Sequence, residues 1–251
     1  MNRDEAILRE LNLYPQWVRR AAAPVAAEPA VVAPIAVAEL DPVTSRAEQP
    51  APVAEPGVST ADNCADLGWA ELKARVQSCT ACALRAGCKQ TVFGVGDEQA
   101  DWLFVGEGSG ADEDERGEPF VGQAGQLLDN MLMAIRLKRG KSVYITNVVK
   151  CRPPGNRAPE AAEIRQCLPY LQRQIQLVRP KVIVALGKTA ALALLGVDAT
   201  LGSLRGKVHD CQGTPLIITY HPAYLLRTPA DKAKAWQDLC LAVSTMNGLV
   251  D

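Results

Sequence analysis

The chain lacks any uninterrupted apolar run long enough to cross a membrane. Its most apolar stretch covers residues 21–38, but that stretch is interrupted by Pro24, Glu28, Pro29 and Pro34. A spanning helix needs about 20 consecutive apolar residues. The sequence also has no positively charged start followed by an apolar core, the pattern of a secretory leader. We therefore expect a cytoplasmic protein with no membrane partner.

The chain also lacks a large excess of either positive or negative charge, because its net charge is only -1. The charges are unevenly spread, however: residues 1–75 hold 7 Lys/Arg and 11 Asp/Glu, and the rest of the chain holds 20 and 17. Basic proteins bind nucleic acid largely by displacing counterions from phosphates. The modest positive excess after residue 75 permits a nucleic-acid partner without requiring one.

Three regions differ in composition. Residues 1–20 have apolar side chains at helical spacing and predict an amphipathic helix that ends at Arg19-Arg20. Residues 21–62 are rich in Ala, Pro and Val and predict a disordered, semi-rigid linker. The remainder, residues 63–251, is expected to form one folded domain.

Within that domain, strand-like and helix-like segments alternate. Short apolar runs predict strands at Trp102–Val105, Val143–Val149, Val182–Leu186 and Leu216–Thr219. Helical patterns fall near Ala65–Val76, Leu127–Ile135, Glu160–Val178, Thr189–Leu195 and Lys232–Met246. Alternation of this kind indicates an α/β fold in which helices cover both faces of a mainly parallel sheet of about four strands. Functional residues then lie beyond the carboxyl ends of the strands.

Three polar segments follow predicted strands. The first, Gly106-Glu107-Gly108-Ser109-Gly110-Ala111, matches a dinucleotide-binding fingerprint, but the four acids that follow it would repel a pyrophosphate. Its glycines more plausibly let the backbone approach a flat ligand closely. The second segment carries Asn147, and the third carries His221, one of only two histidines. Taken singly, Asn147 suits a turn and His221 a structural position, but together the three segments predict a site.

Cysteine is abundant, with eight residues. In a reducing compartment, metal binding is a better explanation of regular cysteine spacing than disulfides. Cys79-x-x-Cys82 precedes Cys151 and Cys167, which lie at either end of a helix-like stretch. Four thiolates suit zinc or an iron–sulfur cluster. The separation between Cys82 and Cys151 is far longer than the roughly 15–20 residues of a compact zinc ribbon.

The other cysteines are less suited to this centre. Cys88 is the nearest competitor as a ligand, because it follows Cys82 closely. Cys64, Cys211 and Cys240 have no such spacing and are expected to be incidental or buried thiols.

The segment from about Cys79 to Met246 resembles the family 4 uracil-DNA glycosylases, base-excision enzymes of bacteria and archaea that carry a [4Fe–4S] cluster. The resemblance rests on the four cysteines, the Gly106-Glu107-Gly108 turn, the run Gly117-Glu118-Pro119-Phe120-Val121-Gly122 with Ala124-Gly125-Gln126-Leu127-Leu128 after it, the strand with Asn147, and His221-Pro222-Ala223. It implies a three-layer α/β/α fold, a monofunctional glycosylase acting on uracil-containing DNA, and a nucleoid-associated protein of the bacterial cytoplasm.

The resemblance implies roles for individual residues. Asn147 reads uracil, because its amide matches the O4 acceptor and N3–H donor of the base. Phe120 stacks on the base, and His221 with the backbone of Glu107 and Gly108 stabilises charge that develops on it. Glu107 is also a candidate for positioning water. Glu113 is a candidate for excluding the thymine methyl group, with a solvated loop acid as the alternative.

DNA contacts are expected on both sides of the site. Leu225 and Leu226 are candidates for a wedge that fills the space of the flipped base, with Arg227 on a phosphate. Simple helix packing is the alternative for the two leucines. A second phosphate contact is expected from Lys138, Arg139 and Lys141, which form a basic run.

The chain departs from the family at Ser109, where a proline is usual. Loss of that proline is expected to loosen the pocket floor or to alter the rate. There is also no Arg- and His-rich insertion of the kind found in a related subgroup that becomes covalently trapped on uracil-DNA, so ordinary turnover is expected.

Two further expectations complete the interpretation. The alternative function is a catalytically weak, cluster-bearing DNA-binding or recruitment module of the same fold. Residues 1–20 resemble the peptide by which the psi subunit of bacterial DNA polymerase III binds the chi subunit, and so predict docking on a replisome protein. An inert helical extension is the alternative for this segment.

Overall fold

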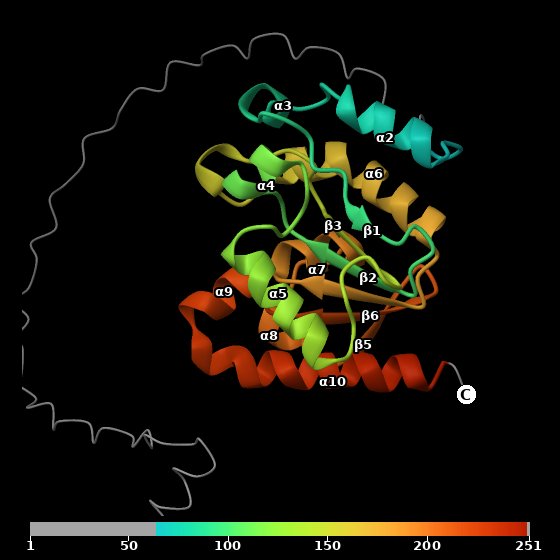
Figure 1. Ribbon diagram of the computed structural model, residues 1–251, viewed down its shortest axis with the longest axis vertical. Helices are drawn as coiled ribbons and strands as arrows, with labels where there is room; N and C mark the ends of the chain where they lie inside the picture. The colour runs from blue at the N-terminus through green and yellow to red at the C-terminus, as the bar shows by residue number, and fades with distance from the viewer. Residues whose placement is uncertain (1–63, 250–251) are drawn as a thin grey trace, which may run out of the picture. The chain divides into compact units, whose positions relative to one another are not determined.

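The computed structural model describes residues 64–249. The predicted amphipathic helix at residues 1–20, the linker at residues 21–62 and the predicted start of the domain lie outside the described residues. Figure 1 shows the described part as a central sheet between two layers of helices.

The central sheet has six strands in the order β1-β3-β2-β4-β6-β5. Its four inner strands are those that the sequence predicts, and neighbouring inner strands pair in parallel. They are β2 (Trp102–Gly106), β3 (Val143–Asn147), β4 (Val182–Leu186) and β6 (Thr214–Thr219). The predicted fold class is therefore confirmed.

The two edge strands were missed by the prediction of about four strands. They are β1 (Val95–Gly96), which pairs antiparallel with β3, and β5 (Val208–Cys211), which pairs antiparallel with β6. β1 has only two residues, and β5 is largely exposed with a His-Asp pair at its centre. Neither strand contains the apolar run by which a buried strand is recognised.

The inner strands are apolar along their whole length because both of their faces are covered. In β2 the side chains of Leu103 and Val105 join one buried cluster, and those of Trp102 and Phe104 join the other. This is the alternation expected of a strand, in which successive side chains point to opposite faces.

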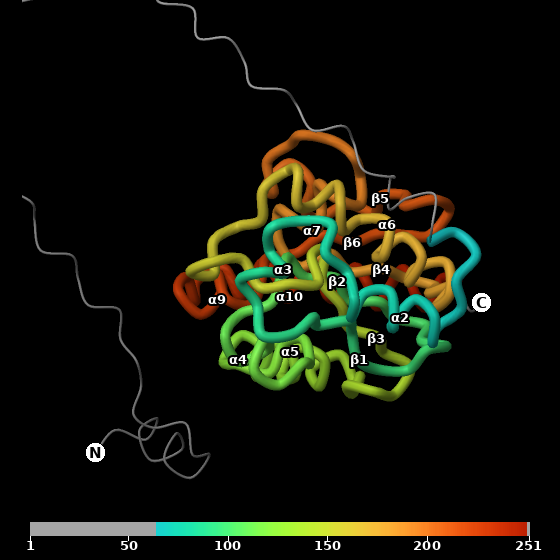
Figure 2. The backbone as a smooth tube through the Cα atoms, turned by 90° about the horizontal axis from the view of Figure 1, so that it is seen from above, coloured from blue at the N-terminus to red at the C-terminus, as the bar shows by residue number. Residues whose placement is uncertain are grey.

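The helices divide between these two clusters. Buried residues of α2, α6, α7 and α8 pack with Leu103 and Val105, whereas those of α5 and α10 pack with Trp102 and Phe104. The α-helices are α2 (Trp69–Gln77), α3 (Leu84–Gly87), α4 (Ala111–Arg116), α5 (Gln123–Ala134), α6 (Ala161–Val178), α7 (Lys188–Leu195), α8 (Leu201–Leu204), α9 (Pro222–Arg227) and α10 (Lys232–Asn247), with 3-10 turns η2 (Pro154–Asn156) and η3 (Pro229–Asp231). Figure 2 looks onto the face covered by α2 and α6.

No described helix combines the length and the apolar character that crossing a membrane requires. The carboxyl ends of the inner strands meet at one edge of the sheet. There α4 and α9, which follow β2 and β6 in the chain, lie at the left of Figure 1. The loops at this edge position the site.

Candidate active site

A cavity of about 510 Å³ opens at the carboxyl edge of the sheet. Its walls come from four segments of the chain, within residues 107–113, 120–124, 153–157 and 221–227. Six residues singled out from the sequence are among the lining residues: Glu107, Gly108, Glu113, Phe120, His221 and Arg227. The structure thus gathers side chains from loops that are far apart in the sequence.

Asn147, the last residue of β3, is not itself among the residues that line this cavity, but it lies next to Phe120, which is. The Cα of Asn147 is paired in register with Gly106 of β2. A Cβ atom on Gly106 would lie 2.5 Å from Cζ of Phe120 and would also overlap Oδ1 of Asn147. The missing side chain at Gly106 is therefore what lets the Asn147 amide and the Phe120 ring approach each other.

The Asn147 side chain is buried, with 1% of its surface exposed. Among the described residues, its Oδ1 atom has no hydrogen-bond partner. Buried polar atoms in native structures are usually paired, so an unpaired one next to a cavity indicates a binding position for a ligand or a water. Ser109, also in the cavity wall, has a buried hydroxyl with no partner among the described residues.

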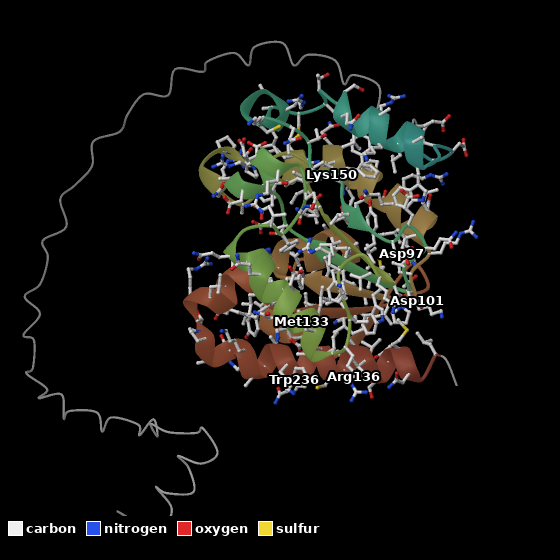
Figure 3. The ribbon with its side chains drawn as sticks, in the orientation of Figure 1. Asp97, Asp101, Met133, Arg136, Lys150 and Trp236 are labelled. Carbon is white, nitrogen blue, oxygen red and sulfur yellow. The ribbon has the colours of Figure 1, made fainter. Side chains whose placement is uncertain are left out.

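The end of β3 is fixed by Lys150, which is fully buried and can be followed in Figure 3. Its ammonium nitrogen donates to the carbonyl oxygen of Asn147 at 2.7 Å, to Oγ1 of Thr146 at 2.7 Å and to Oε1 of Gln174 at 2.6 Å. Burial lowers the pKa of Lys150 to about 7, whereas three oxygen acceptors favour the charged form with three N–H groups. No pattern in the sequence predicted that Lys150 would be buried in this way.

Phe120 forms another side of the cavity. Its backbone has a φ of 56°, in the left-handed region. The ring lies 5.5 Å, centroid to centroid, from the imidazole of His221, with 31° between the planes. The two rings therefore approach from different segments, and both border the cavity.

His221 precedes the first turn of α9 and caps it. Its Nδ1 accepts a hydrogen bond from the backbone N–H of Ala223 at 3.2 Å. Burial, reinforced by the positive charge of Arg227, lowers the pKa of His221 to about 4, against a smaller opposing effect of Glu113. The imidazole is therefore neutral near pH 7, and because Nδ1 is the acceptor, its proton is on Nε2.

The two carboxylates differ in their partners. One oxygen of Glu107 accepts a short hydrogen bond from Oγ1 of Thr189, at the start of α7. Glu113 accepts from the backbone N–H groups of Gly110 at 3.0 Å, Val121 at 2.9 Å and Gly122 at 3.0 Å. Glu113 is thus engaged by the backbone and is not a solvated loop acid, and it ties α4 to the loop that carries Phe120.

Of the two leucines predicted to contact DNA, only one lies at the surface. Leu225 is buried, with 1% of its surface exposed, whereas Leu226 is 41% exposed. Leu225 therefore fits the alternative of helix packing, and only Leu226 projects into solvent. Arg227 lines the cavity.

The three residues of the basic run, Lys138, Arg139 and Lys141, differ in exposure. Lys138 and Lys141 are exposed. Arg139 instead donates to the carbonyl oxygens of Pro119 and Phe120. The expectation of a phosphate contact is thus wrong for Arg139 in this arrangement, because its side chain turns inward.

Several cavity residues were not singled out from the sequence. Arg157 lines the cavity and forms an ion pair with Glu163, with 2.7 Å between Nη2 and Oε1. Tyr224 lines it as well and stacks on Tyr220, with 5.0 Å between ring centroids. The only sequence signal for Tyr224 was its place three residues after His221, on the first turn of the helix.

The four cysteines singled out from the sequence line a second, small cavity between α3, α6 and the loop after β3. They are Cys79, Cys82, Cys151 and Cys167. The backbone N–H of Lys150 donates to Sγ of Cys167 at 3.2 Å. Within residues 64–249, no three or more His, Cys, Asp or Glu side chains are grouped so as to hold one metal ion.

The surroundings of this cavity are mainly apolar. Burial raises the pKa of the Cys151 thiol, and it raises the pKa of Cys167 to about 11. Cys88 is not in the cavity wall, although its thiol is near enough to contribute to the shift at Cys151. Of the other cysteines, Cys64 and Cys211 are buried and Cys240 is exposed.

Comparison with known proteins gives a consistent result. A sequence profile of the Uracil DNA glycosylase superfamily matches residues 93–240. A type-4 uracil-DNA glycosylase of Pyrobaculum aerophilum is 43% identical over 174 residues, which cover 66% of this chain and 88% of that protein. A type-4 uracil-DNA glycosylase of Archaeoglobus fulgidus is 45% identical over 162 residues, 61% of this chain and 81% of that protein.

A bacterial relative agrees with the two archaeal ones. A type-4 uracil-DNA glycosylase of Thermotoga maritima is 43% identical over 162 residues, which cover 64% of this chain and 84% of that protein. The profile match includes all four chain segments that line the large cavity. With this fold, this cavity and these relatives, the chain belongs to the uracil-DNA glycosylase superfamily.

Proposed function

We propose that this protein is a monofunctional uracil-DNA glycosylase, which flips uracil out of DNA and hydrolyses its N-glycosidic bond in base-excision repair. The observation that carries the proposal is the unpaired amide oxygen of Asn147 next to the ring of Phe120, which in turn packs near His221. Membership of the superfamily and the type-4 relatives support it. We also propose a cytoplasmic location, beside the chromosomal DNA on which such an enzyme would act.

Base recognition follows from the buried amide. A uracil stacked within a duplex is out of reach, so it is first turned out of the helix, at a cost of a few kcal/mol. Oδ1 of Asn147 then accepts from uracil N3–H, and the amide N–H donates to O4. Cytosine presents the opposite donor and acceptor at these positions and leaves both groups of Asn147 unpaired. Phe120 provides the flat face, and such stacking contributes about 1–3 kcal/mol per base.

Bond cleavage leaves negative charge on the departing uracil, chiefly at O2. A neutral His221 with its proton on Nε2 supplies a hydrogen-bond donor for that oxygen. The backbone N–H groups near Glu107 and Gly108 supply further donors. These donors are preorganised, because Nδ1 of His221 is already engaged by Ala223.

Glu107 is proposed to position the attacking water. Its hydrogen bond from Thr189 occupies one carboxylate oxygen, which leaves the other to accept from a water at the cavity wall. Glu113 has a different role, because three backbone N–H groups occupy its carboxylate. Glu113 holds the loop that borders the pocket in its shape. It would exclude the thymine methyl group only indirectly, through the shape of that loop.

DNA binding is proposed to use the exposed end of α9. Leu226 enters the space that the flipped base leaves, and Arg227 contacts a phosphate. Lys138 and Lys141 add positive charge at a distance from the cavity. These contacts position the strand and do not read its sequence.

The second cavity is proposed to hold a [4Fe–4S] cluster, with zinc as the alternative. The chemistry of the donors supports this proposal: four thiols border one cavity, and a backbone N–H donates to Sγ of Cys167. A bound cluster would crosslink α3, α6 and the loop after β3. Hydrolysis of a glycosidic bond moves no electrons, so we assign it a structural role.

Residues 1–20 are proposed to dock on a replisome protein similar to the chi subunit of DNA polymerase III. They lie outside the described residues, and the proposal rests on their apolar pattern and the tether that follows. Such docking would bring repair to replication forks.

The glycosylase activity is tested by release of free uracil from an oligonucleotide with a single uracil. Replacing His221 or Asn147 with Ala is expected to slow release by about 10²–10³-fold, the usual cost of one transition-state donor. His209→Ala is the matched control, because the other histidine bonds to the carbonyl of Leu204 in a different part of the fold. DNA binding without uracil release by the unmodified chain would favour the alternative function, a catalytically weak DNA-binding or recruitment module.

The protonation state of His221 gives a second test. The imidazole is expected to be neutral and protonated on Nε2 from pH 8 to pH 5, and to titrate only near pH 4. Between pH 6.5 and 4 the unfolded chain binds more protons at this residue than the folded chain does. The contribution of His221 to stability is therefore complete above pH 6.5 and is lost as the pH falls toward 4.

This behaviour is measured by ¹⁵N NMR of the ring nitrogens, with the His221→Gln variant for assignment. Titration of His221 near pH 6.5, or a proton on Nδ1, would contradict the assigned donor.

The cluster is tested by colour. Protein purified without oxygen is expected to be brown, with broad visible absorption that Cys151→Ala abolishes and Cys240→Ala preserves. Metal analysis accompanies the spectra. Colourless protein with one zinc per chain would refute the cluster and establish the alternative metal.

The docking segment is tested by deleting residues 1–20. The shortened chain is expected to lose its pull-down by the chi-like subunit while it releases uracil at an unchanged rate. A chain whose first 20 residues are scrambled serves as the control for length and composition. Equal pull-down by all three chains would leave the segment as an inert extension.

A further inference from the structure

Phe120 has a backbone conformation that its side chain does not favour. Its φ of 56° is in the left-handed region, which bulky residues rarely adopt. Such a conformation costs on the order of 1–3 kcal/mol and persists only where the surroundings impose it. The residues that impose it therefore determine where the ring lies.

Arg139 is the main such residue. Its Nη1 donates to the carbonyl oxygen of Pro119 at 2.9 Å, and its Nη2 donates to the carbonyl oxygen of Phe120 at 2.8 Å. Nε donates to Oδ1 of Asp129, on α5, at 3.0 Å. The planar guanidinium thus holds two successive carbonyl groups at once, which a single ammonium group does not reproduce.

The other side of the same loop is held as well. Glu113 accepts from the N–H groups of Val121 and Gly122. At Gly125 a Cβ atom would overlap the carbonyl group of Phe120. Arg139 therefore binds the carbonyl groups of this loop and Glu113 binds its N–H groups, with Phe120 between the two sets of contacts.

The contacts of Arg139 also set it apart from its basic neighbours. Each of its three side-chain nitrogens has an inward partner, and the side chain is only 22% exposed. Lys138 and Lys141 are exposed on either side of it. A phosphate contact requires the opposite arrangement, with the guanidinium directed outward.

We propose that Arg139 is a positioning residue, which fixes the Phe120 ring as the stacking face for the flipped base. The inference rests on the proposed function, because a stacking role for Phe120 belongs to it. Arg139 touches neither the base nor the strand. It acts by setting the backbone of the loop before substrate arrives, so that no rearrangement is needed on binding.

Arg139→Gln and Arg139→Lys are compared with Arg136→Gln. The control removes the same charge from an exposed arginine in the same connection between α5 and β3; Arg136 lies beside α10 in Figure 3, away from α4 and α9. Four quantities are measured: the single-turnover cleavage rate, the half-saturating DNA concentration at several salt concentrations, inhibition by free uracil, and hydrogen exchange of the peptide containing residues 119–122.

Both Arg139 variants are expected to cleave on the order of 10- to 100-fold more slowly, the usual effect of a misplaced site group. They are also expected to bind free uracil more weakly and to exchange faster in that peptide. The salt dependence of DNA binding stays as in the unmodified chain, and Arg136→Gln changes none of these quantities. Asp129→Asn, which removes only the carboxylate that orients the guanidinium, is expected to show a smaller effect and replaces Arg139→Gln if that variant fails to fold.

Two outcomes would overturn the inference. One is a weaker salt dependence and a higher half-saturating DNA concentration with unchanged cleavage and uracil inhibition, because these indicate a phosphate contact. The other is full activity in Arg139→Lys, since charge alone would then suffice. If the unmodified chain releases no uracil, the proposed function fails, but faster exchange at residues 119–122 in the variants alone still supports the role of Arg139 in holding the loop.

Discussion

A buried ammonium group holds the two cavities of this domain in a fixed relation. Lys150 donates from its side chain to the last residues of β3 and to Gln174 of α6, and its backbone N–H donates to Cys167 of the same helix. Asn147 is three residues before it and Cys151 directly follows it. Because a buried charge is tolerated only when its hydrogen bonds are complete, these partners have little freedom to move independently. The amide that faces the large cavity and the thiols of the small one therefore share one support.

Two polar side chains of the large cavity are held by backbone groups. The N–H of Ala223 orients the His221 ring, and the N–H groups of three loop residues bind the carboxylate of Glu113. Arrangements of this kind fix a side chain more firmly than contacts with other side chains do, because the backbone is itself held by the sheet and helices. Among the described residues, the Asn147 amide oxygen and the Ser109 hydroxyl are left without partners, close to where a ligand would bind.

The sequence predicted the parallel core because β2 and β4 are apolar throughout, and it predicted Asn147 and His221 because polar residues at strand ends are conspicuous. It did not predict the inward course of Arg139 or the backbone contacts of Glu113. Two of the three Arg139 partners and all three of the Glu113 partners are backbone atoms, which have no signature in the sequence. Leu225 and Leu226 show another limit: adjacent residues on a helix point in different directions. The pattern alone did not say which of them is buried, and the docking of α9 against α5 decides it.

The unpaired oxygen of Asn147 has a consequence for how this chain responds to selection for stability. A buried polar atom without a partner costs about 1–3 kcal/mol, a large share of the 5–15 kcal/mol by which domains are usually stable. An apolar residue of similar size, such as leucine, would remove that cost. A screen that rewards only heat resistance would therefore tend to replace the side chain that we propose distinguishes uracil from cytosine. At this position thermostability and discrimination between bases are opposed, so engineering of the domain has to exempt Asn147 from stability optimisation.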